Sequence, residues 1–131
     1  MMRMLAGLFV VCASANLAWA DDDIYTLTVN ETRARVGQEA TLAVTVKGAK
    51  GYKANAEYPN AIKDLKADGA ARLAAKQVAG KVEADAITFA VKLVPSAKGT
   101  TKVSGDIRFS VCNDKSCKVK RAPLAGLVTA E

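Results

Sequence analysis

The stretch of residues 87–93, which reads Ile-Thr-Phe-Ala-Val-Lys-Leu, decides the fold class of this chain. Its large apolar residues are Ile87, Phe89, Val91 and Leu93, and the residues between them are small or polar. A period of two places the apolar side chains on one face of a β-strand. A strand with one buried and one solvated face is typical of an antiparallel sheet.

The same alternation recurs on both sides of this stretch. The segments that carry it are residues 25–29, 40–47, 103–111 and, with a bend near Pro123, 117–129. Turns are predicted at Gly37-Gln38 and between Pro95 and Gly99. Several short strands separated by turns favour a β-sandwich. In the segment 103–111 the outward set contains Asp106, Arg108 and Ser110, and continuing the alternation places Cys112 outward as well.

Residues 61–79 leave a choice between one helix and two strands. Their many alanines and lysines favour a helix, whereas Gly69 inside a helix would cost about 1 kcal/mol. Asp68-Gly69 is a good hairpin turn. We therefore predict strands over 61–67 and 71–79, with a helix as the alternative, and a polar connection over 82–84.

The first twenty residues have the pattern of a cleavable secretory signal. Arg3 precedes the apolar run 5–11, and Ala18-Trp19-Ala20 is followed by three aspartates. We expect cleavage near Ala20 and one domain over residues 21–131, located in the periplasm or secreted. No later stretch reaches the roughly 20 apolar residues of a membrane-spanning helix, so we expect no stable membrane insertion of the mature chain.

Composition excludes several kinds of site. The 131 residues contain no histidine, which removes a Ser/His/Asp triad, a Cys/His nucleophile pair and histidine metal ligands. No glycine-rich phosphate loop or second cysteine pair is present, so we expect neither a cofactor nor a metal. The net charge of +6 comes mostly from scattered lysines, which is typical of a solvated surface. We do not predict nucleic-acid binding, because basic residues do not alternate with aromatic ones.

Cys112 and Cys117 are separated by Asn113-Asp114-Lys115-Ser116, a run of good turn residues. The returning strand can place Cys117 opposite Cys112, at a distance that a disulfide bridges. A loop of about six residues gives a chain-entropy stabilisation of about 2 kcal/mol, which is modest for a purely structural bond. Lys115 and Lys118 flank Cys117 and favour its thiolate, so both a structural and an exchanging disulfide remain open.

A second candidate is the segment 51–59, in which Tyr52 and Tyr58 flank Asn55 and Glu57. Aromatic residues on loops often anchor interfaces. One hypothesis is therefore a cap or a partner-binding loop near the cysteines. The alternative is an ordinary connection whose tyrosines pack on the sandwich.

The run of residues 109–117, Phe-Ser-Val-Cys-Asn-Asp-Lys-Ser-Cys, resembles the cysteine hairpin in the N-terminal periplasmic domain of the thiol:disulfide interchange protein DsbD and its relatives. This resemblance implies an immunoglobulin-like antiparallel β-sandwich of about seven to eight strands. It also implies that Cys112 and Cys117 pass electrons to or from a periplasmic thioredoxin-like oxidoreductase or a membrane reductant. The run 118–121, Lys-Val-Lys-Arg, stands where members of that family often have a proline-rich phrase.

Two functions follow from these observations. The first is a periplasmic thiol–disulfide exchange module, which would be a component of a thiol–disulfide oxidoreductase system. The second is a non-catalytic, exported immunoglobulin-like binding or assembly domain, in which the Cys112–Cys117 bond only holds a hairpin.

Overall fold

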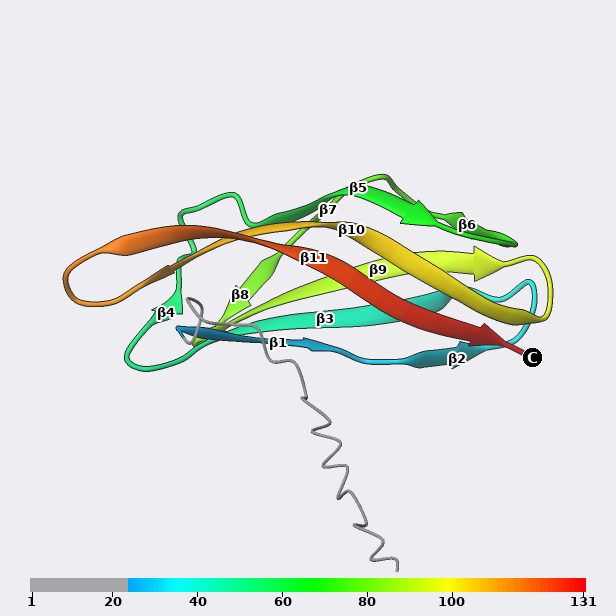
Figure 1. Ribbon diagram of the computed structural model, residues 1–131, viewed down its shortest axis with the longest axis horizontal. Helices are drawn as coiled ribbons and strands as arrows, with labels where there is room; N and C mark the ends of the chain where they lie inside the picture. Colours follow the sequence, from blue (N-terminus) through cyan, green and yellow to red (C-terminus); the bar gives the residue numbers. More distant parts are fainter. Residues whose placement is uncertain (1–23) are drawn as a thin grey trace, which may run out of the picture.

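The computed structural model describes residues 24–131, and the predicted signal sequence lies outside these residues. The described chain forms eleven β-strands in two sheets (Figure 1). The strands are β1 (Tyr25–Val29), β2 (Thr32–Ala34), β3 (Ala40–Gly48), β4 (Lys53–Ala54), β5 (Ala61–Ala67), β6 (Ala71–Leu73), β7 (Val78–Ala79), β8 (Lys81–Glu83), β9 (Ala86–Pro95), β10 (Gly99–Cys112) and β11 (Cys117–Ala130).

The strand order is that of an immunoglobulin domain. One sheet runs β1-β3-β9-β6, with β8 also paired to β9. The other runs β2-β11-β10-β5-β7, with β4 also paired to β10. The first, second and fifth strands of an immunoglobulin domain share one sheet with the fourth, and the third, sixth and seventh form the other. The strands β1, β3, β5, β9, β10 and β11 follow this scheme, with β6 and β8 in the place of the fourth strand.

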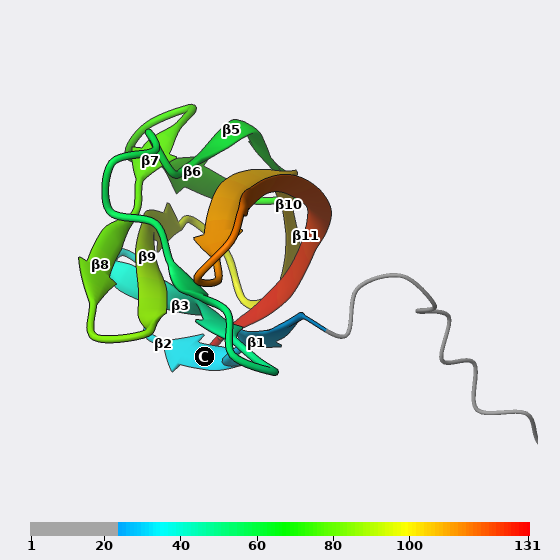
Figure 2. The same cartoon turned by 90° about the vertical axis from the view of Figure 1, so that its left-hand side faces the viewer.

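The predicted period-two strands are confirmed. Residues 87–93 lie in β9, with all four of their large apolar side chains at most 2% exposed. Residues 61–79 form strands and not the alternative helix, and β5 occupies residues 61–67 as predicted. The sheets enclose one core, and its largest fully buried side chains are Phe89, Phe109, Leu42, Ile62, Ile87, Leu93 and Ile107. Figure 2, viewed from the end that carries the tip of the β10–β11 hairpin, shows the strands of the two sheets curving around a common interior.

Three local predictions were wrong. Residues 82 and 83 do not belong to a polar connection, because they pair with β9 in strand β8, and only Ala84 of the predicted range lies in the turn that follows. Residues 71–79 are not one strand but two, since β6 joins the sheet of β9 and β7 joins the sheet of β5. The count of seven to eight strands was too low, because five strands are only two or three residues long. Strands this short carry no readable alternation.

The end of the sandwich that carries the cysteines is shaped by turns. Lys50 and Gly51 both have positive φ, 53° and 84°, and Tyr52 N–H donates to Ala49 O over 3.0 Å. This is the arrangement of a type I′ turn, which reverses the chain tightly. It returns the chain after β3 so that β4 lies beside the end of β10.

Candidate functional site at the disulfide hairpin

The hairpin of β10 and β11 is the longest paired element of the described chain. Its register runs without interruption from Gly99 opposite Ala130 to Cys112 opposite Cys117. Inner positions of this ladder are buried, as for Ile107, Phe109 and Leu124. The far end of the hairpin extends beyond the other strands (Figure 1).

Cys112 and Cys117 form a disulfide at this far end, as the sequence predicted. Their Cα atoms are 4.0 Å apart, and each residue faces the other directly across the ladder. The turn between them is held by Asn113, whose Oδ1 accepts the N–H groups of Lys115 and Ser116 over 2.9 and 2.8 Å. Asn113 N–H in turn donates to Ser116 O over 2.9 Å. The tip is thus closed covalently and by three hydrogen bonds.

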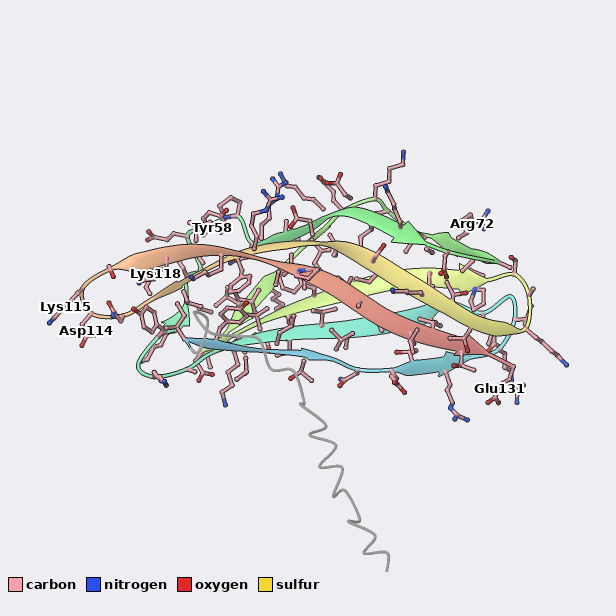
Figure 3. All side chains as sticks on the ribbon, viewed as in Figure 1. Tyr58, Arg72, Asp114, Lys115, Lys118 and Glu131 are labelled. Atoms are coloured by element: carbon pink, nitrogen blue, oxygen red, sulfur yellow. A yellow bond between two sulfur atoms is a disulfide. The ribbon has the colours of Figure 1, made fainter. Side chains whose placement is uncertain are left out.

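The two cysteines differ in exposure. Cys112 is half-buried, whereas Cys117 and the residues 114–119 are exposed. Figure 3 shows Asp114 and Lys115 at the far end of the hairpin, with Lys118 close behind.

The other neighbour of Cys112 is the segment 53–60. Lys53 of β4 lies opposite Cys112, and Ala54 lies opposite Val111. Gly48 allows the segment to pass close by, since a Cβ at this position would lie 2.0 Å from Tyr52 O. The structure therefore places the candidate loop beside the disulfide rather than across the domain.

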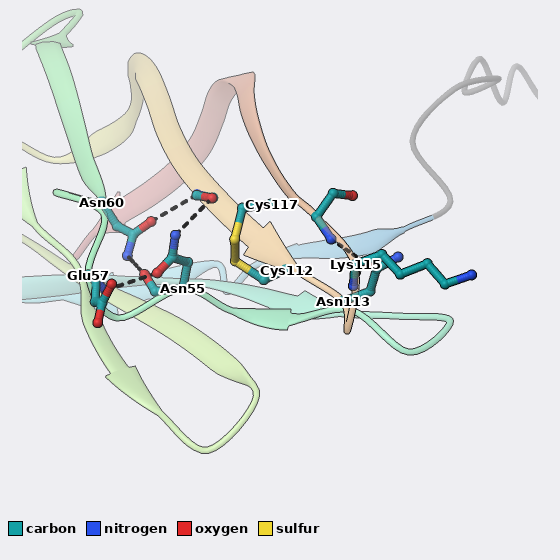
Figure 4. Close-up of a disulfide and its surroundings, with 9 residues drawn as sticks. Asn55, Glu57, Asn60, Cys112, Asn113, Lys115 and Cys117 are labelled. Carbon is teal, nitrogen blue, oxygen red and sulfur yellow. Dashed lines mark hydrogen bonds between the residues drawn. A yellow bond between two sulfur atoms is a disulfide. The ribbon is translucent and has the colours of Figure 1, made fainter.

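Two asparagine side chains complete the sheet between β4 and β5 (Figure 4). Asn60 Oδ1 accepts Ser110 N–H over 3.0 Å, and Asn60 Nδ2 donates to Asn55 O over 2.9 Å. Asn55 N–H donates to Ser110 O over 2.9 Å, and Asn55 Nδ2 donates to Ser110 Oγ over 3.3 Å. These bonds provide hydrogen-bond partners for the backbone N–H and C=O of Ser110, which lie between the parts of β10 that pair with β4 and with β5.

This network corrects the prediction that Ser110 faces solvent. Ser110 keeps its place in the outward alternation, but the segment 55–60 covers it and leaves only 1% of it exposed. Asn60, which the sequence did not single out, is 5% exposed. A polar residue beside a proline is common in loops, so no sequence signal identified it.

The four residues predicted for the loop divide by environment. Tyr52 is half-buried and packs against the core, and Tyr58 is also half-buried. Asn55 uses its side chain within the protein, since its Oδ1 also accepts Glu57 N–H over 3.0 Å. Glu57 itself is exposed. Tyr52 therefore packs on the sandwich, and a role of this loop in partner binding stays a prediction.

An ionic cluster lies on the outer face of the same hairpin. Asp106 Oδ2 is 2.6 Å from Arg121 Nη2 and 2.8 Å from Arg108 Nε. The hydrogen bond from Arg121, followed by that from Arg108, lowers the pKa of Asp106 below its ordinary value of 3.8. The same bond raises the pKa of Arg121. Asp106 thus joins β10 to β11 and offsets part of the charge of both arginines.

Other chemistry finds little support among residues 24–131. No group of three or more cysteine, aspartate or glutamate side chains gathers there as a metal site would require. No helix long and apolar enough to cross a bilayer occurs in this part of the chain.

Comparisons with known proteins found no matching family model and no matching curated protein. Among solved structures, the chain is similar to AggA, the major subunit of aggregative adherence fimbriae type I from Escherichia coli, with a TM-score of 0.44 and 8% identity over 82% of this chain and 94% of that one. It is also similar to PapD-like domain 7 of human CEP192, with a TM-score of 0.35 and 9% identity over 92% and 96% of the two chains.

Function has to be argued from the site, because one fold serves many functions. Strand order, sheet pairing and the buried core agree with one another. From Ile24 to Glu131 the chain is an immunoglobulin-like β-sandwich with a disulfide at the tip of its longest hairpin.

Proposed function

We propose that this protein is a non-catalytic binding or assembly domain, in which the Cys112–Cys117 bond holds the tip of the β10–β11 hairpin in one conformation. The observation that carries the proposal is the position of the bond. It joins directly opposed residues at the end of a hairpin that extends beyond the sandwich (Figure 1).

A rigid, extended tip is suited to contact with a partner. Binding costs free energy when loops and side chains are ordered, and a loop already held in its bound conformation avoids part of that cost. The disulfide and the three hydrogen bonds around Asn113 supply this order before any partner arrives. The bond itself closes a short loop and stabilises the whole domain by only about 2 kcal/mol.

The place of action proposed for the domain is outside the cytoplasm. The support is the signal-like pattern of residues 1–20, and the disulfide is consistent with it because such bonds persist in oxidising compartments. Two measurements test the proposed export: the cell fraction in which the protein is found, and the identity of the N-terminal residue of the purified protein. Retention in the cytoplasm with residues 1–20 still attached would contradict it.

The second candidate is thiol–disulfide exchange, which the exposure of Cys117 favours. A thiolate of a partner dithiol would attack Sγ of Cys117, form a mixed disulfide and release the thiolate of Cys112. The second thiol of the partner would then resolve the mixed disulfide. The partner would leave oxidised to a disulfide, and Cys112 and Cys117 would both be reduced.

The reduction potential of the Cys112–Cys117 pair separates the two candidates. We expect a value below about −300 mV, typical of a structural bond. A clearly higher value, together with a mixed disulfide formed by Cys112→Ala through Cys117, would replace the proposal by the exchange function. Cys117→Ala is the matched control, because its remaining thiol at Cys112 is half-buried and should trap less.

A further inference from the structure

The two sides of strand β11 are paired very unequally. One side bonds to β10 along the whole strand. The other side pairs only with β2, and only at residues 128–130. Among residues 24–131, no strand pairs with this second side over residues 117–127, which we call the outer edge of β11.

The register shows which backbone groups face the outer edge. Asn113 N–H donates to Ser116 O, so this pair is hydrogen-bonded and the next pair, Cys112 with Cys117, is not. Bonded and non-bonded pairs alternate along an antiparallel ladder, so the odd-numbered residues of β11 direct their backbone groups away from β10. Glu131 N–H, which donates to Ala34 O of β2, follows the same rule.

Proline divides this edge into two parts. Pro123 lacks an N–H and occupies an outward-directed position, where the β10 ladder loses nothing. Proline on an edge is one of the devices that limit unwanted strand pairing. The part before it, with the outward-directed residues Cys117, Val119 and Arg121, keeps its N–H donors.

The side chains of this part are apolar and basic. Val119 is 58% exposed, more than the two other exposed large apolar residues of the described chain, Val36 at 38% and Leu127 at 41%. Lys118 precedes it and is exposed, whereas the exposed Arg121, two residues later, is already paired with Asp106. The strand β11 contains no acidic residue.

We propose that residues 117–121 bind an extended, acidic peptide segment of a partner protein, which adds to the sheet as a further strand. The backbone of the peptide would bond to the outward N–H and C=O groups of residues 117, 119 and 121. An apolar side chain of the peptide would cover Val119 on the outer face of the strand, and acidic side chains on the opposite face would lie near Lys118. A second copy of the protein fits poorly, because two such edges would bring like charges together.

This inference rests on the binding role proposed above and names its surface and partner class. A short, capped peptide of alternating glutamate and valine is the probe. We expect saturable binding to the purified protein at low ionic strength, with amide NMR shifts confined to residues 117–121 and slower hydrogen exchange at the N–H groups of 117, 119 and 121. The same peptide methylated on alternate backbone nitrogens should bind about tenfold more weakly, as the loss of one or two hydrogen bonds requires.

Matched variants separate strand addition from charge attraction. Val119→Pro removes one outward N–H without touching the bonds to β10, so binding should fall about tenfold. Ala125→Pro makes the same change beyond Pro123, at an exposed residue of the same edge, and should leave binding unchanged. Lys118→Glu should weaken binding, whereas Lys66→Glu, at an exposed position of β5, should not.

Three results would overturn the inference. The first is equal binding of the methylated peptide or equal binding by Val119→Pro, which would show attraction by charge alone. The second is self-association of the protein that Val119→Pro abolishes, which would make a second copy the occupant. The third is absence of peptide binding by a well-folded protein. If the Cys112–Cys117 pair then has a reduction potential below about −300 mV, the outer edge of β11 is not the contact surface, but the proposed binding or assembly role of the domain still stands.

Discussion

Strand β10 is held differently on its two sides near the hairpin tip. On the β11 side a continuous ladder and a disulfide join residues that are neighbours in sequence. On the other side the side chains of Asn55 and Asn60 replace a strand and reach Ser110 from about fifty residues away, with sequence separations of 55 and 50. The first side is built from local contacts, and the second depends on the whole domain being folded.

The comparison shows where stability and exposure lie. Asn60 and Ser110 of the asparagine network are buried, so their polar groups have to be satisfied within the protein. The disulfide end is exposed, and water can replace most of what its hydrogen bonds provide. We therefore expect the asparagine side of β10 to contribute more to the free energy of unfolding than the disulfide side, and four experiments test this expectation.

The largest effect is expected for Asn60→Ala. It leaves the buried N–H of Ser110 and the carbonyl oxygen of Asn55 without their partners, which should lower the free energy of unfolding by about 3 kcal/mol. Denaturant unfolding measures this change, with Asn55→Ala as a milder companion because Asn55 is only half-buried. A loss smaller than that caused by removing the disulfide would reverse the comparison.

The double variant Cys112→Ala/Cys117→Ala comes second. Opening a loop this short should lower the free energy of unfolding by about 2 kcal/mol, and the amide NMR spectrum should change only around residues 110–119. Spectral changes that spread into β3 and β9 would show that the bond organises the core as well. The wild-type protein under reducing conditions should behave like the double variant.

A smaller effect is expected for Asn113→Ala. Its Oδ1 accepts two N–H groups in the turn, but the turn is exposed and water can take over. We expect a loss of about 0.5 kcal/mol in the oxidised protein. Thermal unfolding of Asn113→Ala in the oxidised and in the disulfide-free background checks it, and a larger loss without the disulfide would show that the two devices support each other.

The smallest effect is a change with pH at the ionic cluster. Because its arginine neighbours lower the pKa of Asp106 in the folded state, its carboxylate stabilises the fold above its ordinary value of 3.8 and loses this role as the pH falls through the lowered value. Asp106→Asn should therefore weaken the protein at neutral pH and reduce the loss of stability on acidification. Unfolding midpoints of both proteins across the acid range test it; parallel curves would show that the cluster contributes nothing.

The local side of β10 could be predicted from the sequence. Alternation identified β9 and the inner face of β10, and the turn residues 113–116 placed the two cysteines opposite each other. The bounds of β5 also followed, because Asp68-Gly69 marks its end. These features depend on residues within a few positions of one another.

The remote side could not be predicted in this way. The burial of Ser110 depends on Asn55 and Asn60, which no period or spacing connects to it. The strands β4 and β7 have two residues each, too few for a pattern, and β6 and β7 join different sheets although they are close in sequence. Tertiary contacts determine which sheet such a short segment joins, and its own sequence does not indicate the strand with which it pairs.

The position of the disulfide also bears on how the hairpin finds its alignment. A one-residue slip between β10 and β11 would turn Leu124 and Val128 to the solvent and bring Val119 and Arg121 toward the core side. With Cys112 bonded to Cys117, directly across the ladder, such a slip is prevented before the rest of the sandwich has formed. A bond that adds little free energy thus selects one alignment for the longest strands of the described chain.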